Sequence, residues 1–155
     1  MREKTESYAE ATQQIIAITQ GEQNLIAVMA TCSCILATEF PENIWTGFYI
    51  VDKENPNELV VGPYQGTIGC LRILMGKGVC GTAAQTGVTQ VISDVHEFPG
   101  HIACDSRSAS EIVVPVYDAE RGLIAVLDID NPRIGAFDNI DKIALESLVE
   151  KVFGK

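Results

Sequence analysis

Hydrophobic residues in the first forty positions recur at spacings of three and four, the pattern of a helix with one buried face. Gly21 divides this stretch in two, and Pro41 follows its end. The apolar face of the second half is formed by Leu25, Met29, Cys32 and Leu36. The pattern predicts two helices within about residues 5–39.

A further long helix is expected at the C-terminal end of the chain. Asp138 is a suitable N-cap residue there, and Asp141 follows three positions later. The apolar stripe predicted to be buried consists of Ile140, Ala144, Leu148 and Val152.

The middle of the chain contains short runs of aromatic and β-branched residues separated by polar turns, which is typical of a sheet. Strands are predicted over residues 43–51, 58–62, 70–76, 88–93, 111–118 and 122–130. A short helix is predicted over 76–87, and the polar segment 94–110 is expected to be a functional or disordered loop. Short turns favour a mostly antiparallel sheet flanked by helices, in one α+β domain over residues 1–155.

Composition and charge narrow the possible functions. The 155 residues are 46% hydrophobic and carry a formal net charge of −10, which argues against nucleic acid and anionic membrane surfaces as partners. No run approaches the ~20 apolar residues of a membrane-spanning helix. The polar start of the chain lacks the apolar core of a signal peptide, so we expect a cytoplasmic protein.

Five cysteines are the first candidates for chemistry. They are Cys32, Cys34, Cys70, Cys80 and Cys104. An odd count does not suggest a framework of structural disulfides, so catalytic, metal-binding or buried thiols remain. Cys80 begins a short helix, whose dipole would favour a thiolate. Cys104 lies on the long loop beside His101 and Arg107, potential cations that would lower the pKa of its thiol.

Two other chemistries are disfavoured. The sequence contains no C-x₂-C pair, and the spacings of its cysteines with His96 and His101 match no common zinc pattern. No nucleophile-elbow motif supports a serine hydrolase.

Two aspartates end an apolar strand, a position where this residue type is uncommon. Strand alternation puts Asp128 and Asp130 on one face. Ile124 and Val126 are expected on the same face, and Glu111 would join them if its strand pairs with theirs. Apolar surroundings and like-charge repulsion would raise the pKa of at least one carboxyl, which could then donate a proton near neutral pH. The alternative is that these acids lie at solvated strand ends.

Trp45 and Tyr49 are predicted to share a strand face, with Gly47 between them on the same side. A glycine within a strand often marks the close approach of a ligand or of another backbone. Two aromatic walls around a gap would suit a methyl or thioether group. The alternative is ordinary core packing.

Several uncommon motifs follow one another from about residue 43 to the last helix. They are GPYQG followed by a cysteine, GKGVCGTA, GHIACD, SEIV-x-P and VLDID. In order and spacing they resemble the free methionine-(R)-sulfoxide reductases. The resemblance implies a GAF fold with a six-stranded antiparallel sheet between helices, a catalytic core over about residues 43–153, and a homodimer. The helices before residue 40 resemble that family only in type.

The resemblance also assigns roles to single residues. It implies that Cys104 is the nucleophile and Cys70 the resolving cysteine, whereas Cys80 corresponds to a third cysteine of the family. Catalytic acids are expected at Glu111 and Asp130. Substrate-binding residues are expected at Trp45, Tyr49, Asp128 and Cys80.

The implied activity is reduction of free L-methionine-(R)-S-oxide to methionine. Cys104 would attack the sulfoxide sulfur and become a sulfenic acid, and Cys70 would condense with it to a disulfide that thioredoxin reduces. No metal or organic cofactor is expected. The competing interpretation is a non-catalytic GAF sensor of a small molecule or of redox state, which the fold alone would permit.

Overall fold

The computed structural model describes residues 2–155. These residues form a six-stranded antiparallel sheet with helices on its two faces, and the strand order is β3-β2-β1-β6-β5-β4. The strands are β1 Trp45–Val51, β2 Glu58–Gly66, β3 Arg72–Leu74, β4 Gln90–Ile92, β5 Ser110–Tyr117 and β6 Leu123–Asn131. The α+β fold and its antiparallel sheet agree with the prediction.

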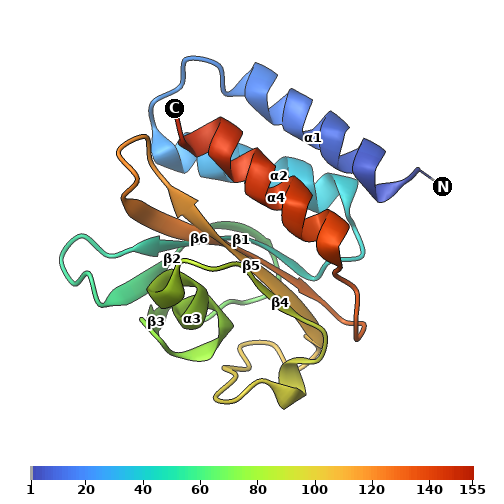
Figure 1. Ribbon diagram of the computed structural model, residues 1–155, viewed down its shortest axis with the longest axis vertical. Coiled ribbons are helices and arrows are strands. Elements are labelled where there is room, and N and C mark those ends of the chain that lie inside the picture. The colour runs from blue at the N-terminus through green and yellow to red at the C-terminus, as the bar shows by residue number, and fades with distance from the viewer. Residues whose placement is uncertain (1) are drawn as a thin grey trace.

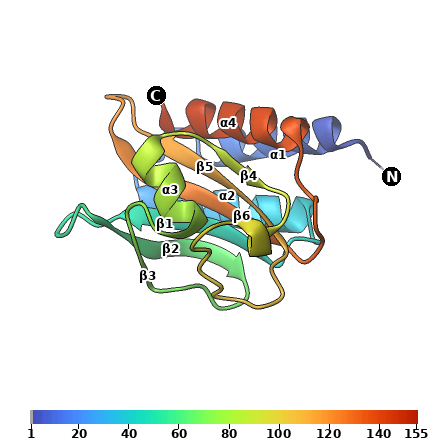
Figure 2. The same ribbon diagram turned by 60° about the horizontal axis from the view of Figure 1, so that its bottom comes forward.

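Helices cover both faces of the sheet (Figures 1 and 2). Three long helices lie on one side: α1 Lys4–Ile18, α2 Leu25–Glu39 and α4 Asn139–Phe153. The short helix α3 Gly78–Thr86 lies on the other side, where the segment between β4 and β5 also runs and forms a 3₁₀ turn, Val95–Glu97. Among residues 2–155, no helix has the length and apolar character needed to cross a bilayer.

The sheet separates two apolar clusters. On the side of the long helices, Phe48, Leu127 and Ile129 are at most 1% exposed and pack with helix residues such as Met29 and Leu148. On the side of α3, a second cluster contains Trp45, Tyr49, Val79, Val113 and Val126. Because side chains alternate along a strand, each central strand contributes to both clusters. Polar residues that point to the α3 side therefore lie beside apolar neighbours.

Helix α4 is fixed at its start by α1. Asp138 caps the helix, and its carboxylate accepts from the backbone N–H groups of Ile140 and Asp141. The buried Asp141 accepts from the hydroxyl of Tyr8 at 2.8 Å and from Lys4 Nζ at 2.6 Å. The predicted N-cap is therefore present, and the last helix packs against the first.

Two helix positions that were predicted to be buried are exposed. Leu25 is 45% exposed and Ile140 is 46% exposed, because both lie in the first turn of their helices. The buried side of α4 consists of Asp141, Leu145, Leu148, Val149 and Phe153, which is rotated by one position from the predicted stripe. The rotation brings Asp141 into contact with Tyr8 and Lys4 of α1. The sequence did not predict it, because an aspartate is not recognisable as a core residue from its type.

The strand that was predicted over residues 70–76 is shorter in the structure. Strand β3 begins at Arg72, so Cys70 does not open a strand but lies in the loop before it. Strand β2 is longer than predicted and runs to Gly66. The loop carries Cys70 away from the sheet and toward Cys104, with 5.4 Å between the two Cα atoms.

A bulge changes the face on which one predicted residue lies. The pairing of β5 with β6 runs in register from Ser110 to Val116 and then shifts, so that Tyr117 pairs with Leu123. Ile124 is the extra residue and packs on the long-helix side. The prediction that Ile124 shares a face with the two aspartates is therefore wrong, whereas Val126 does lie on their side.

Candidate functional site

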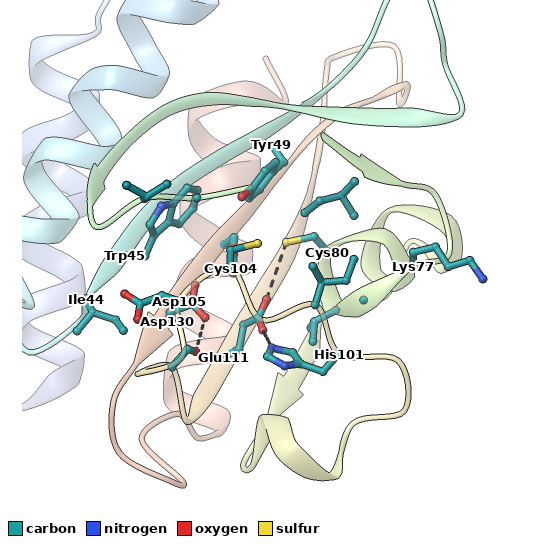
Figure 3. Close-up of a pocket in the computed structure, with 18 residues that line it drawn as sticks. Ile44, Trp45, Tyr49, Lys77, Cys80, His101, Cys104, Asp105, Glu111 and Asp130 are labelled. Atoms are coloured by element: carbon teal, nitrogen blue, oxygen red, sulfur yellow. Dashed lines mark hydrogen bonds and ion pairs between the residues drawn. The ribbon is translucent and has the colours of Figure 1, made fainter. Parts of the chain in front are cut away.

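A pocket opens on the α3 side of the sheet, where the ends of β1, β5 and β6 meet α3 and the loops that carry Cys70 and Cys104 (Figure 3). Its open space is about 40 Å³, enough for a few water molecules. The predicted site residues that line it are Trp45, Tyr49, Cys80, Cys104, Glu111, Asp128 and Asp130. Cys70 joins the site through its bond to Cys104.

The register of β5 against β6 brings the three acids together. Glu111 is paired with Asp130, and Val113 is paired with Asp128, so the carboxyl groups converge on one face at the strand ends. Glu111 is 6% exposed and Asp128 is 5% exposed, while Asp130 is partly exposed. The alternative of a solvated strand end is therefore wrong for Glu111 and Asp128.

Burial sets the protonation of these acids. Removal from water raises the pKa of Glu111 and of Asp128 well above the usual range, and the charge of Asp130 raises both further. Desolvation also raises the pKa of Asp130 to about 6, although a hydrogen bond from Ser108 and the nearby His101 oppose the rise. The pocket therefore holds protonated carboxyl groups beside one that ionises near neutral pH.

Cys80 lies in the first turn of α3 with its sulfur 3.9 Å from Glu111 Oε1. Burial raises the pKa of this thiol well above its usual value, and the nearby carboxyl groups of Asp128 and Glu111 disfavour a thiolate further. The prediction that the helix dipole would make Cys80 a thiolate is therefore wrong. A neutral S–H group beside the acids is what the geometry supports.

The residues that could hold a metal are Cys80, Glu111 and Asp128, whose ligand atoms lie within 4.8 Å of one another. All three groups have raised pKa values, so a metal ion would have to displace their protons on binding. The absence of a metal cofactor remains a prediction.

Cys70 and Cys104 are joined by a disulfide at the edge of the pocket. Cys104 is exposed and Cys70 is partly buried. The remaining cysteines are free: Cys32 is buried in the helix-side core, as predicted, and Cys34 is exposed. The structure thus selects one pair from the five cysteines, 34 residues apart in the sequence.

The cations expected near Cys104 are not free charges. Arg107 forms a two-pronged ion pair with Asp105, at 2.9 Å for the closest N–O distance. Burial lowers the pKa of His101, so its ring is neutral at neutral pH. The accessibility of Cys104 agrees with the prediction, but activation of its thiol by a neighbouring cation is not supported.

Trp45 and Tyr49 form one stacked wall. Their ring centroids are 5.3 Å apart, and Tyr64 stacks on the indole at 4.9 Å. A Cβ atom at Gly47 would overlap the Cβ of Tyr64, so this glycine allows a close approach of the neighbouring strand. The predicted slot between two facing walls is therefore wrong: the aromatic rings line one side of the pocket and leave no gap between them.

Two buried polar atoms in this region have no hydrogen-bond partner, Trp45 Nε1 and Asp128 Oδ1. An unpaired buried polar group is costly, and in native structures it often marks a ligand site. A small polar molecule bound against the aromatic wall can therefore accept a hydrogen bond from Trp45 Nε1 and form a second one with Asp128 Oδ1.

The interpretation of the sequence missed two contacts within the site. His101 Nε2 lies 3.5 Å from Glu111 Oε2, and Figure 3 shows Glu111 between His101 and Cys80. Ser108 donates to Asp130 Oδ1 at 2.6 Å. His101 stands three residues before Cys104, which was the only available signal; nothing in the sequence distinguishes Ser108 from the other serines of the loop.

The GAF domain family matches residues 10–152. A free methionine-R-sulfoxide reductase of Escherichia coli is 42% identical over 96% of this chain and 88% of its own length. One from Saccharomyces cerevisiae is 46% identical over 87% of this chain and 77% of its length. The structure of the Neisseria meningitidis enzyme in complex with its substrate is 39% identical, with a TM-score of 0.92 over 98% of this chain and 89% of that one. This chain therefore belongs to the free methionine-R-sulfoxide reductases, a family of oxidoreductases built on the GAF domain.

Proposed function

We propose that this enzyme reduces free L-methionine-(R)-S-oxide to methionine, with Cys104 as nucleophile and Cys70 as resolving cysteine. The observation that carries the proposal is one pocket edge at which a Cys70–Cys104 disulfide lies beside carboxyl groups with raised pKa values. A reductase that works through thiols needs both a sulfur that can be oxidised and a proton for the departing oxygen.

In the first step, the thiolate of Cys104 attacks the sulfoxide sulfur. The oxygen receives a proton from a buried acid, Glu111 or Asp128, whose pKa values are well above the usual range. The substrate S–O bond breaks as the protonated oxygen moves to the Cys104 sulfur, so methionine departs and Cys104 is left as a sulfenic acid. The raised pKa values keep the donor protonated at neutral pH without a metal ion.

In the second step, Cys70 attacks the sulfenic sulfur, water leaves, and the disulfide forms. Thioredoxin then reduces the disulfide and returns two electrons and two protons to the enzyme. One cycle therefore converts one sulfoxide and one dithiol into methionine, water and one disulfide. We propose the cytoplasm as the place of action, since thiols are kept reduced there.

Substrate recognition is assigned to both sides of the pocket. The wall of Trp45 and Tyr49 suits the methylthio end of the substrate. Asp130 was expected to be a catalytic acid and Asp128 to bind the substrate, and we propose to exchange these roles. Asp130, with a pKa of about 6, is ionised at neutral pH and suits the substrate ammonium group, whereas the pKa of Asp128 is high enough for a proton donor. We keep the predicted homodimer as part of the proposal.

The test is turnover of free methionine-R-sulfoxide with thioredoxin, thioredoxin reductase and NADPH. Wild-type enzyme should consume NADPH, and Cys104→Ser should lose turnover and single-turnover reduction alike, because a serine hydroxyl is a far weaker nucleophile. Methionine formation by Cys104→Ser in a single turnover would overturn the assignment. Wild-type enzyme that binds the sulfoxide without reducing it would favour a sensor instead.

A further inference from the structure

The two most exposed large hydrophobic side chains among residues 2–155 flank the resolving cysteine. Ile68 is 81% exposed and Leu71 is 76% exposed, two residues before and one residue after Cys70. Ile102, two residues before Cys104, is 39% exposed. Since the Cα atoms of the two cysteines are 5.4 Å apart, all three aliphatic side chains start close to the disulfide.

Single exposed hydrophobic residues are common on protein surfaces and need no explanation. Here, however, three of them lie within two residues of the cysteines whose bond a partner must reach. Ile18, a comparably exposed residue at 60%, lies at the end of α1 on the opposite side of the sheet. We call the surface formed by Ile68, Leu71 and Ile102 the apolar rim.

The arginines that follow Leu71 and Cys104 in the sequence are both held in ion pairs within the chain. Arg72 forms ion pairs with Asp52 at 2.6 Å and with Glu58 at 3.1 Å. Arg107 is paired with Asp105 at 2.9 Å. Neither arginine is therefore free to attract a partner by charge, and two carboxylates surround Arg72, so what this surface offers a partner is apolar contact. This complements a partner whose contact surface is itself apolar.

We propose that the apolar rim is the docking surface for the protein dithiol that regenerates the enzyme, a protein of the thioredoxin class. The inference rests on the proposed function. A thiolate of the partner attacks one sulfur of the Cys70–Cys104 bond and forms a mixed disulfide, and the other cysteine leaves as a thiolate. The partner's second thiolate then releases the enzyme. The partner is oxidised, and the enzyme takes up two electrons and two protons.

The size of the reductant distinguishes this role from simple access to the bond. A small dithiol such as dithiothreitol needs only to reach a sulfur, and Cys104 is exposed. Exposed apolar side chains next to both cysteines add contact area that only a protein surface can cover. Loss of one rim side chain should therefore weaken reduction by the protein and leave reduction by the small dithiol unchanged.

The test variant is Leu71→Ser, because Leu71 belongs to the rim but does not line the pocket. Turnover of free methionine-R-sulfoxide is measured against thioredoxin concentration, and separately with dithiothreitol. We expect KM for thioredoxin to rise at least about fivefold, with unchanged turnover in dithiothreitol. Ile18→Ser is the matched control and should change neither quantity, and Leu71→Met should restore most of the affinity.

Two results would overturn the docking surface. One is an unchanged KM for thioredoxin in Leu71→Ser, with wild-type melting temperature and wild-type turnover in dithiothreitol. The other is an equal loss with both reductants, which would make Leu71 part of substrate binding or of the fold. Failure of the proposed function is a separate result, because wild-type enzyme would then reduce no methionine-R-sulfoxide with either reductant.

Discussion

Asp130 is a carboxyl group of the pocket whose pKa lies close to neutral pH. Its pKa of about 6 arises from desolvation, opposed by the hydrogen bond from Ser108. Its deeper neighbours Glu111 and Asp128 have pKa values well above the usual range, and the three groups titrate as an interacting set. Small differences in depth within one pocket thus give similar carboxyl groups different charges.

Asp130→Asn should stabilise the protein at pH 8. The folded state holds the Asp130 proton up to about pH 6, whereas the unfolded chain releases it near 3.8. Stability from this group is therefore complete below pH 3.8 and is lost as pH rises through about 6. The amide should raise the free energy of unfolding by roughly 1–3 kcal/mol at pH 8 and by little at pH 4. Urea titrations at both pH values measure this, and an equal effect at both would contradict it.

At least one of Glu111→Gln and Asp128→Asn should slow reduction of the sulfoxide at least roughly 100-fold in a single turnover, because an amide cannot transfer a proton to the departing oxygen. The variant with the slower reduction identifies the donor. Rapid-quench measurement of methionine formation distinguishes this step from thioredoxin turnover. Wild-type rates in both variants would show that neither acid supplies the proton.

Cys70→Ser should separate the two halves of the cycle. Attack by Cys104 does not require Cys70, so about one methionine per site should form, while turnover with thioredoxin collapses. Mass spectrometry of wild-type enzyme after reaction should find a Cys70–Cys104 peptide. Normal steady-state turnover in the variant would mean that another thiol resolves the sulfenic acid; Cys34→Ser serves as the control.

At the scale of elements, the site depends on how α3 approaches the sheet. This helix carries Cys80 and contacts β3, β5 and β6. A Cβ atom at Gly81 would overlap the carbonyl oxygen of Leu74 and lie 3.1 Å from the N atom of Gly76. The glycine therefore sets the distance between the helix and the turn after β3, and with it the depth of Cys80 in the pocket.

The stability of Gly81→Ala shows which effect is larger, the loss of close packing at this position or the higher helix propensity of alanine. Within a helix, this change normally stabilises by about 1 kcal/mol. Here we expect destabilisation by roughly 1–3 kcal/mol, because the added methyl group meets backbone atoms that cannot move independently. Gln85→Ala, an exposed position of the same helix, should change the melting temperature little. A Gly81→Ala protein more stable than wild type would contradict this prediction and show that the turn after β3 can move to accommodate the methyl group.

At the scale of the whole molecule, the sheet keeps two regions apart. The long helices fill one face with apolar side chains, and the other face carries the acids, the aromatic wall and the disulfide. The loop with Cys104 covers this second face and leaves about 40 Å³ of open space. We propose that a substrate bound there lies enclosed between the sheet and this loop, so that its charged ends meet groups of the pocket.

The enclosure predicts selectivity for the free amino acid. An N-acetylated, amidated methionine sulfoxide lacks the ammonium group and extends at both ends, so it should react at least about 100-fold more slowly than the free R epimer. The free S epimer should also be poor, because it exchanges the oxygen and methyl positions relative to the acids and the aromatic wall. Rates are compared at equal concentration with dithiothreitol as reductant. Comparable rates on the blocked compound would refute an enclosed pocket.

The order of elements and the chemistry-bearing residues were determined by the sequence, because alternation, helical spacing and local motifs act over a few neighbours. The strands around Trp45, Glu111 and Asp128 and the N-cap at Asp138 were all recognisable in this way. The pairing of Cys70 with Cys104 followed only from a resemblance to a family, since five cysteines permit many pairs.

Only the tertiary structure decided how deeply the side chains of the site are buried and which of them are protonated. Burial keeps Cys80 a neutral thiol despite its place in the first turn of a helix, and a bulge turns Ile124 away from the acids. The stacked wall of Trp45 and Tyr49 depends on Tyr64 from the neighbouring strand. The burial of Cys80 and the stacking of Tyr64 arise from contacts between segments far apart in the chain, and the bulge arises from the pairing of two whole strands. The free energy of a charge or a ring depends on those neighbours, which no local pattern of residues specifies.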